Sequence, residues 1–192
     1  PGFIPENGNL ELISNNIFKY TPNENYYGTD LFKFYVIDQL WTSNLATVSI
    51  DIFPINDAPE LSIIENIALD EGESTSIIIS AFDIDNIDLS FSISGGSDST
   101  IDKQLFESEV IFTAIGDFNG SEEFVIEVSD GSLSSSQSFT VTAMPVNDAP
   151  EFIEIFHFQT IQEDEVFELD LSTYVLDIEN DPLSIIFSGA SC

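Results

Sequence analysis

An internal repeat of about 91 residues is the feature that most constrains this chain. The segment INDAPE at residues 55–60 recurs as VNDAPE at residues 146–151, and 147 − 56 gives an offset of 91. Two further blocks recur at nearly the same spacing: YGTDLF (27–32) with NGSEEF (119–124), and FDIDN (82–86) with LDIEN (176–180). Self-similarity of this length predicts tandem units that share one fold.

The repeat also predicts where the units begin and end. Residues 1–55 form the C-terminal half of one unit, 56–59 a linker, 60–146 a complete unit, 147–150 a second linker, and 151–192 the N-terminal half of a third unit. The chain is therefore expected to be a window on a longer array. Each half-unit alone leaves an apolar face uncovered, so it is expected to be unstable unless half-units of neighbouring chains complete one another.

The apolar residues alternate with polar ones, which is the pattern of a half-buried β-strand. The alternating apolar sets are Phe32-Phe34-Val36, Val48-Ile50-Ile52, Phe124-Ile126-Val128 and Phe139-Val141-Ala143. Turn signals separate such runs at Gly95-Gly96 and Asp130-Gly131. No segment keeps a helical period. The pattern predicts an all-β chain of tandem Greek-key β-sandwiches.

The charge of the chain excludes several classes of partner. It has 35 acidic residues against 3 basic ones, for a formal net charge of −32. Such a chain cannot build the Lys/Arg patch that nucleic acids or anionic lipid headgroups require. No apolar run approaches the roughly 20 residues of a membrane helix, so membrane insertion is not expected. The single cysteine, Cys192, cannot form an internal disulfide.

Some of the acids recur at strand ends, where a shared cation would explain them. Asp83 and Asp85 lie two residues apart, as do Asp177 and Glu179, and residues i and i+2 of an extended segment point the same way. Asn-Asp pairs occupy both linkers. Calcium binds six to eight such oxygens, whereas magnesium demands strict octahedral geometry and zinc prefers His and Cys. The plainer alternative is that these residues make ordinary turns and a solvated acidic surface.

The Asn-Asp-Ala-Pro linker, the Asp-x-Asp block and the Val-x-Asp-Gly hairpin together resemble bacterial cadherin-like tandem repeats. Such repeats occur in large secreted or cell-surface adhesins. The resemblance covers essentially the whole chain. It implies an elongated, extracellular array of cadherin-like or Ig-like β-sandwiches with calcium at each joint.

Carried over by position, the resemblance implies two sets of metal ligands. The first joint would use Asn56, Asp57, Asp83, Asp85 and Asp130, with only Glu24 or Asn25 available from the preceding half-unit. The second joint would use Glu71, Asp117, Asn147, Asp148, Asp177 and Glu179, and Asp181 is a further candidate. The linkers lack the extra leading Asp of animal cadherins, and Gln39 replaces the Gly expected after Asp38. Both departures imply one or two ions per joint.

The sequence thus predicts a calcium-rigidified structural and adhesion module whose partners are the neighbouring repeats of its own chain. The alternatives are a β-sandwich that binds a glycan or a protein, including homophilic or filament contacts, and an accessory region of a secreted enzyme. The chain itself is not expected to be an enzyme, because its one histidine, His157, has no nucleophile motif to serve. The residues Trp41, Tyr26, Tyr27 and Tyr35 can form a sugar-stacking surface, but packing in the core or at a joint is the favoured expectation.

Overall fold

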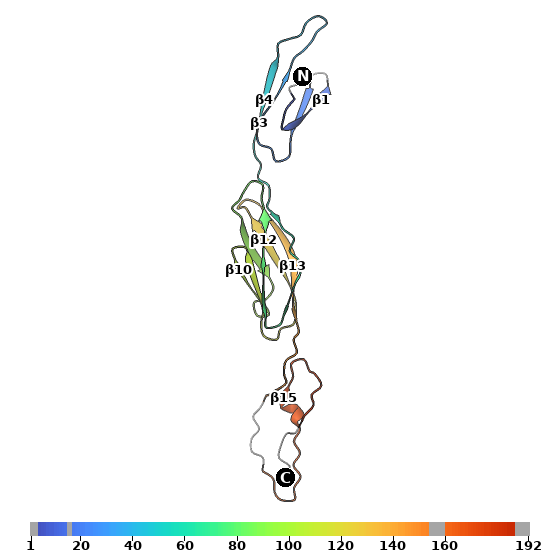
Figure 1. The fold of residues 1–192 in the computed structure, drawn as a ribbon, viewed down its shortest axis with the longest axis vertical. Helices are drawn as coiled ribbons and strands as arrows, with labels where there is room; N and C mark the ends of the chain where they lie inside the picture. Colours follow the sequence, from blue (N-terminus) through green and yellow to red (C-terminus); the bar gives the residue numbers. More distant parts are fainter. Residues whose placement is uncertain (1–3, 15–16, 154–159, 187–192) are drawn as a thin grey trace. The chain divides into compact units, whose positions relative to one another are not determined.

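The structure is a computed structural model that describes residues 4–14, 17–153 and 160–186 (Figure 1). The expectations for His157 and Cys192 lie outside these residues. The strands are β1 (Gly8–Ser14), β2 (Ile17–Pro22), β3 (Gly28–Phe34), β4 (Ala46–Ile52), β5 (Glu60–Leu61), β6 (Ile67–Asp70), β7 (Ser74–Ile78), β8 (Ala81–Phe82), β9 (Ser90–Gly95), β10 (Ile101–Phe106), β11 (Glu109–Ala114), β12 (Gly120–Ser129), β13 (Ser134–Met144), β14 (Glu151–Phe152) and β15 (Val175–Leu176), and η1 (Leu171–Thr173) is a 3-10 turn.

The described residues fall into two compact units. One unit takes in the residues up to Ser62 together with Ser80–Phe91 and Glu127–Ser136. The other takes in Ile63–Ile79, Ser92–Ile126 and the residues from Gln137 onward. Strands β9, β12 and β13 each contribute residues to both units. The repeat boundaries expected from the sequence remain a prediction.

The complete repeat contains a four-stranded sheet, with strand order β6-β13-β12-β9, and a three-stranded sheet, with order β10-β11-β7. The alternation read from the sequence holds along β12, where Phe124, Ile126 and Val128 are all 0% exposed. Their neighbours in sequence are partly or fully exposed. This period of two gives the sheet one apolar face for the core.

Three phenylalanines join the two sheets. The ring centroids of Phe112 on β11 and Phe124 on β12 lie 5.1 Å apart, and those of Phe112 and Phe139 on β13 lie 5.9 Å apart. Both pairs meet edge to face, the geometry that aromatic quadrupoles favour. The expectation of an all-β sandwich is therefore confirmed.

Strand β6 lies along the edge of the four-stranded sheet and pairs parallel with the end of β13. The register runs from Val141 opposite Ile67 to Met144 opposite Asp70. The backbone N–H of Glu71 then donates to the carbonyl of Met144 at 2.9 Å, which extends the ladder by one bond. This pairing carries Glu71 to the end of the sandwich from which the second linker leaves.

The turn at Gly95-Gly96 needs glycine because of its backbone and its surroundings. Gly95 has φ +90° and Gly96 has φ +60°, a region that side chains rarely adopt. A Cβ at Gly95 would lie 2.4 Å from the carbonyl oxygen of Glu123. The turn predicted from this glycine pair is confirmed.

The N-terminal half-unit consists of two antiparallel hairpins, β1–β2 and β3–β4, and a buried carboxylate links them. Asp30 on β3 is 4% exposed and accepts hydrogen bonds from the N–H groups of Glu6 and Asn7 and from the Tyr20 hydroxyl. Burial by itself raises the pKa of Asp30, but these donors hold the pKa below its usual value. Burial and the adjacent carboxylate raise the pKa of Tyr20 to about 12.

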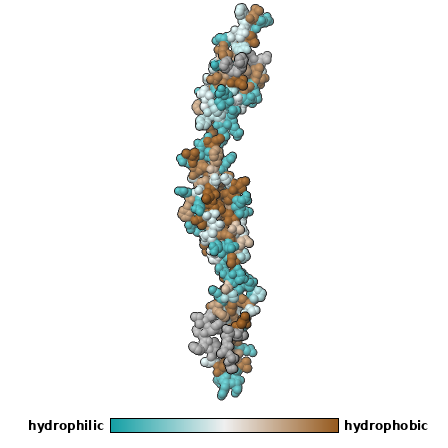
Figure 2. Space-filling model, viewed as in Figure 1, coloured by the Kyte–Doolittle hydropathy of each residue, from teal (hydrophilic) through white to brown (hydrophobic). Residues whose placement is uncertain are grey.

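Many apolar side chains of this half-unit reach the surface, and Figure 2 shows brown apolar residues among teal hydrophilic ones. Val36 is 63% exposed and follows the end of β3, so its expected place in the alternating core face is not observed. Trp41 is 75% exposed, which corrects the expectation that it packs in the core or at a joint. Tyr26 is half-buried, and its hydroxyl donates to the carbonyl of Thr29 at 3.0 Å.

The residues that follow the second linker contain little regular structure within the described range. Strands β14 and β15 pair over two residues each, as β5 and β8 do in the complete repeat. Asp170 caps η1 by accepting from the N–H of Ser172. The other described residues after Phe152 lie in no strand. The pairing of β14 with β15 therefore reproduces only the start of the complete repeat.

The aromatic cluster should contribute strongly to the stability of the complete repeat. Replacing Phe124 with Ala removes a fully buried ring from between the sheets, so the free energy of unfolding should fall by about 3–5 kcal/mol. Denaturant unfolding measures this loss. The matched control is Phe106→Ala, because Phe106 is 57% exposed and should cost far less. Equal losses for both variants would contradict the packing described.

Candidate metal centre

At the first joint, Asp83 occupies a tight turn directly after β8. It is 8% exposed, and its Oδ1 accepts from the backbone N–H groups of Asp85 and Asn86, both at 2.8 Å. Its Oδ2 is buried and has no hydrogen-bond partner among the described residues. A buried carboxylate oxygen without a donor is costly, and a cation beside it removes that cost.

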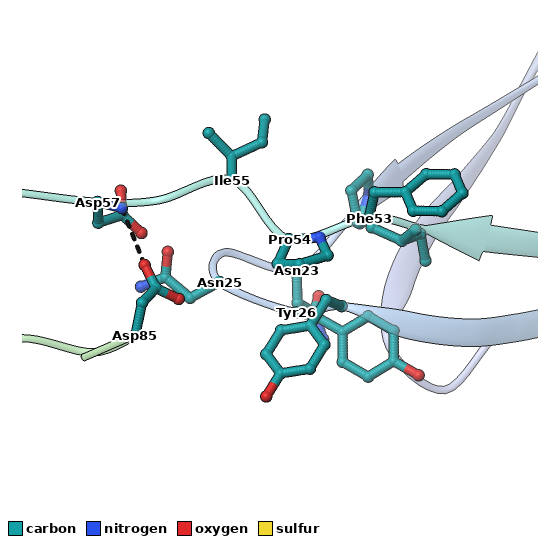
Figure 3. Close-up of a pocket in the computed structure, with 11 residues that line it drawn as sticks. Asn23, Asn25, Tyr26, Phe53, Pro54, Ile55, Asp57 and Asp85 are labelled. Carbon is teal, nitrogen blue, oxygen red and sulfur yellow. Dashed lines mark hydrogen bonds between the residues drawn. The ribbon is translucent and has the colours of Figure 1, made fainter. Parts of the chain in front are cut away.

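The first linker brings further oxygens to the same place. The backbone N–H of Asp57 donates to Oδ2 of Asp85 at 2.8 Å, and Figure 3 shows Asn25 next to this pair. The side-chain amide of Asn56 donates to Oδ2 of Asp130 at 2.6 Å. The side chain of Asn56 also donates to the carbonyl of Asp57 at 3.0 Å, so hydrogen bonds link all five residues predicted for this joint.

Asp130 holds the hairpin between β12 and β13. Its Oδ1 accepts from the N–H groups of Ser132 and Leu133 at 2.6 and 2.7 Å. The bond from Leu133, together with that from the Asn56 side chain, holds the pKa of Asp130 below its usual value. The carboxylate therefore remains charged in mildly acidic solution.

At the second joint, Glu71 follows β6 and is 8% exposed. Its Oε1 accepts from the backbone N–H of Val146 at 2.6 Å, and its Oε2 accepts from the side-chain amide of Asn119 at 3.3 Å. These bonds fix a charged side chain against the start of the second linker.

Glu71 meets two further acids there. Carboxylate oxygens of Glu71, Asp148 and Glu179 all lie within 4.8 Å of one another, the only such group of three acids, cysteines or histidines among the residues that the structure describes. Glu179 accepts from the N–H of Asp148 through Oε2 at 3.3 Å, while its Oε1 is buried and has no partner in the described part of the chain. Two unit charges 4 Å apart repel by about 4 kcal/mol at an effective dielectric constant of 20. The cluster suits a cation that prefers oxygen ligands, as calcium does.

The remaining residues predicted for this joint lie around the cluster. Asp177 is 8% exposed and accepts from the N–H of Asp181 at 2.8 Å, while the Asp181 side chain is exposed. The side chain of Asn147 donates to the carbonyl of Asp148 at 2.9 Å. Asp117 is exposed and borders a hollow of about 360 Å³ that Asp148 also lines. None of these four belongs to the group of three acids.

Two asparagines were not predicted as site residues. Asn119 donates to Glu71, and the side chain of Asn86 donates to the carbonyl of Asp130 at 3.2 Å. A sequence signal existed for Asn86, because Asn180 occupies the same place in the next repeat. No such signal exists for Asn119, because Tyr27 stands at the corresponding position.

A family model for the bacterial Ig domain matches residues 2–51 and 56–142, well over half of the 192 residues. The chain belongs to the bacterial Ig domain family. The coarser part of the resemblance, an Ig-like bacterial repeat, is therefore shown. None of the curated proteins compared with this bacterial Ig chain matches it. Its described part contains no helix with the length and apolar character needed to cross a membrane.

Several solved structures are similar to this bacterial Ig chain at low identity. Domains 4–9 of the surface layer protein SbsC share 14% identity and a TM-score of 0.38, with 85% of this chain and 27% of that chain covered. An endo-fucoidan hydrolase from glycoside hydrolase family 107 shares 19% identity and a TM-score of 0.36. The match covers 75% of this chain and only 22% of the hydrolase chain. TM-scores below 0.5 decide neither fold nor function.

The hydrogen bonds of Asp130 generate a pH prediction. Because the folded-state pKa lies below the reference value of 3.8, the stabilisation is present above about pH 4 and is lost as the pH falls through the folded pKa. A carboxyl NMR titration should show this low pKa. Asn56→Ala should raise the pKa of Asp130 toward the ordinary value, whereas an unchanged titration would contradict the Asn56 contact.

Proposed function

We propose that this chain is a non-catalytic structural segment of a repetitive cell-surface or secreted protein, stiffened by calcium at its joints. The observation that carries the proposal is the group formed by Glu71, Asp148 and Glu179, in which a buried oxygen of Glu179 has no donor from the residues that the structure describes. The acids come from the complete repeat, the second linker and the following half-unit. A cation held among them would therefore tie three segments together.

The mechanism is electrostatic. Without a cation the crowded carboxylates repel, and the linker between them is free to bend away. With calcium, oxygens from both sides of the linker share one ion, and the joint is fixed. Extracellular modules bind calcium with Kd on the order of 10⁻⁴–10⁻³ M, so the sites would fill in calcium-rich surroundings outside cells.

The first joint supports the same role. The buried Oδ2 of Asp83 has no donor within residues 4–14, 17–153 and 160–186, and Asp57 and Asp85 line the same hollow. The acidic surface, with a net charge of −32, also suits a module that must stay soluble and unaggregated outside the cell. The proposal includes the resemblance of the chain to cadherin-like repeats and an adhesive role for the parent protein.

A second candidate function rests on exposed aromatic residues. Trp41, Tyr27 and Tyr35 are 75%, 62% and 56% exposed, so each offers a ring face to a ligand. A neutral glycan stacks on such faces without opposing the negative charge of the chain. An accessory role beside a secreted enzyme would use the same exposed rings.

Substitution of Trp41 tests the glycan-binding function. If the exposed ring stacks on sugars, Trp41→Ala should abolish binding on a glycan array while leaving the melting temperature nearly unchanged, because the side chain touches little. Leu40→Ala is the matched control, since Leu40 is 82% exposed in the same turn. Equal binding by both variants and the parent chain would eliminate Trp41 as a platform.

Calcium should stabilise the chain through the second joint. At ten to a hundred times Kd, one site adds roughly 1.4–2.7 kcal/mol to the free energy of unfolding, or a rise of roughly 3–10 °C in melting temperature. Differential scanning calorimetry with calcium and with a chelator measures the rise. Glu71→Gln and Asp148→Asn should each reduce it.

The control for these variants is Glu73→Gln. Glu73 is an exposed acid two residues beyond Glu71, so its substitution makes the same change in charge. Its calcium response should equal that of the parent chain. If Glu71→Gln and Glu73→Gln respond alike, the effect of calcium is a general one on an acidic surface, and the proposed site is wrong.

A further inference from the structure

We propose that the open edge of β9 is a self-association surface, on which β9 of a second copy of this chain pairs antiparallel. The contact goes beyond the proposed function, because it needs no calcium and uses none of the joint acids. Strand β9 lies inside the complete repeat, with β8 before it and β10 after it along the chain. Pairing at this edge would join the four-stranded sheets of two copies into one continuous sheet.

Strand β9 forms one edge of the four-stranded sheet, and β12 is its one pairing partner among the described residues. The N–H of Gly96 donates to the carbonyl of Glu123 on β12 at 3.1 Å, so every second residue before Gly96 also turns its backbone groups toward β12. The N–H and C=O groups of Phe91 and Ile93 therefore face away from the sheet. A row of such groups is a template for a further strand.

The apolar layer of the sheet is also less covered at this edge than in its interior. Phe91 and Ile93 are half-buried, whereas Phe124, Ile126 and Val128 on the neighbouring β12 are 0% exposed. The serines of β9 alternate with its two apolar residues and are exposed. A strand added beside β9 would cover the open sides of Phe91 and Ile93, which is favourable because it removes apolar surface from water.

The charge distribution favours a second copy as the added strand. No charged residue occurs from Leu89 to Ser97, although the chain has 35 acids in 192 residues. Like charges directly opposite each other destabilise a strand pair, so two copies of this acidic chain repel wherever their acids meet. Along β9 they can touch without that repulsion. A cationic partner would gain nothing from a charge-free strand and would be drawn to the acids elsewhere.

Strand β10, an edge strand of the other sheet, carries protection that β9 lacks. It contains Asp102 and Lys103, and Lys103 pairs with the buried Phe112 of β11, so its side chain starts toward the core. The Lys103 Nζ lies 2.6 Å from Oδ1 of Asp98. Charged residues on an edge, especially inward-pointing ones, discourage pairing with another chain. Strand β9 has neither a charge nor a proline.

Strand β7 also lacks charge, but its edge is occupied just beyond the strand. The N–H of Ile79 donates to the carbonyl of Ser108 next to β11, whereas the next residue, Ser80, accepts from the N–H of Ser62 at 2.8 Å. Strands β5 and β8 continue this pairing. A strand added to β7 would have to end before Ser80. No comparable neighbour limits β9 within the described residues.

The sequence of β9 suits one antiparallel register, with a two-fold axis at Ser92. In this register Phe91 of each copy lies opposite Ile93 of the other, and the two residues exchange their free N–H and C=O groups. Leu89 lies opposite Gly95, so no charged residue is opposed along the strand. The contact uses the same surface on both copies, so it closes at a dimer.

Sedimentation velocity of the 192-residue chain tests this dimer. Dimers should form as the protein concentration rises, and more readily at high salt, because screening weakens the repulsion between copies of net charge −32. Ser92→Glu should weaken dimerisation about tenfold or more, because it places two carboxylates opposite each other at the axis. Ser138→Glu makes the same charge change at an exposed site on the interior strand β13 and should dimerise like the parent chain.

A charge-pairing experiment keeps the test independent of any single variant. Ser92→Lys alone should also dimerise weakly, since two ammonium groups would meet at the axis. An equal mixture of Ser92→Lys and Ser92→Glu should dimerise more strongly than either variant alone, because opposite charges then face each other. Because Ser92 is exposed, both variants should keep the circular dichroism spectrum of the parent chain.

A disulfide tests the register. In a Cys192→Ser background, Ser92→Cys should form a linked dimer on mild oxidation. The two copies of residue 92 would form a closely spaced pair with Cα atoms about 4.5 Å apart, within the range that a disulfide spans. Ser138→Cys is the matched control and should stay unlinked at the same protein concentration. Non-reducing gel electrophoresis measures both outcomes.

Three results would overturn the proposal. The first is a chain that stays monomeric at every concentration and salt. The second is equal dimerisation by Ser92→Glu and Ser138→Glu, which would place any contact elsewhere. The third is dimerisation that Ser76→Glu weakens and Ser92→Glu does not, because Ser76 is an exposed residue of β7 and the contact would then use that edge.

Discussion

Backbone N–H groups hold one oxygen of most joint acids and leave the second oxygen without a backbone donor, as at Glu71, Asp83 and Glu179. Asp83 and Glu179 show this division most clearly, since each has one bonded oxygen and one buried oxygen with no partner among the described residues. The backbone bonds fix the position of the charge, and the second oxygen remains available to a ligand. The joints depend on this arrangement, because it gathers acids that would otherwise separate.

Not every repeated acid serves a joint. Asp30 and Glu122 are 92 residues apart, and both accept hydrogen bonds from a loop that precedes a strand. Asp30 bonds to Glu6 and Asn7 before β1, and Glu122 bonds to Ser97 and Thr100 before β10. Protein donors serve both oxygens of each carboxylate. An acid of this kind organises a loop and has little to offer a cation, which distinguishes it from Asp83.

The alternation in the sequence predicted β12 and β13 of the complete repeat, and three residues predicted for the second joint, Glu71, Asp148 and Glu179, lie together in the structure. The strand prediction succeeded because alternation is a local property of the sequence. The joint prediction succeeded for these three acids because residues at equivalent positions of two repeats take similar places in the fold. Prediction from the sequence failed where burial depends on the rest of the fold. Phe32 is 7% exposed whereas Val36, on the same predicted face, is 63% exposed, and no pattern in the sequence distinguishes them. Asn119 was missed because its contact with Glu71 spans 48 positions.

The parallel pairing of β6 with β13 has a mechanical consequence. Strand β6 lies near the start of the complete repeat and β13 near its end, and the two run in the same direction. Tension applied to the two flanking linkers therefore pulls these strands past each other and loads their hydrogen bonds in shear. Bonds loaded in shear share the force and rupture together, whereas bonds at the end of a hairpin open one at a time. A short ladder of four residue pairs therefore carries load in shear when the repeat is stretched.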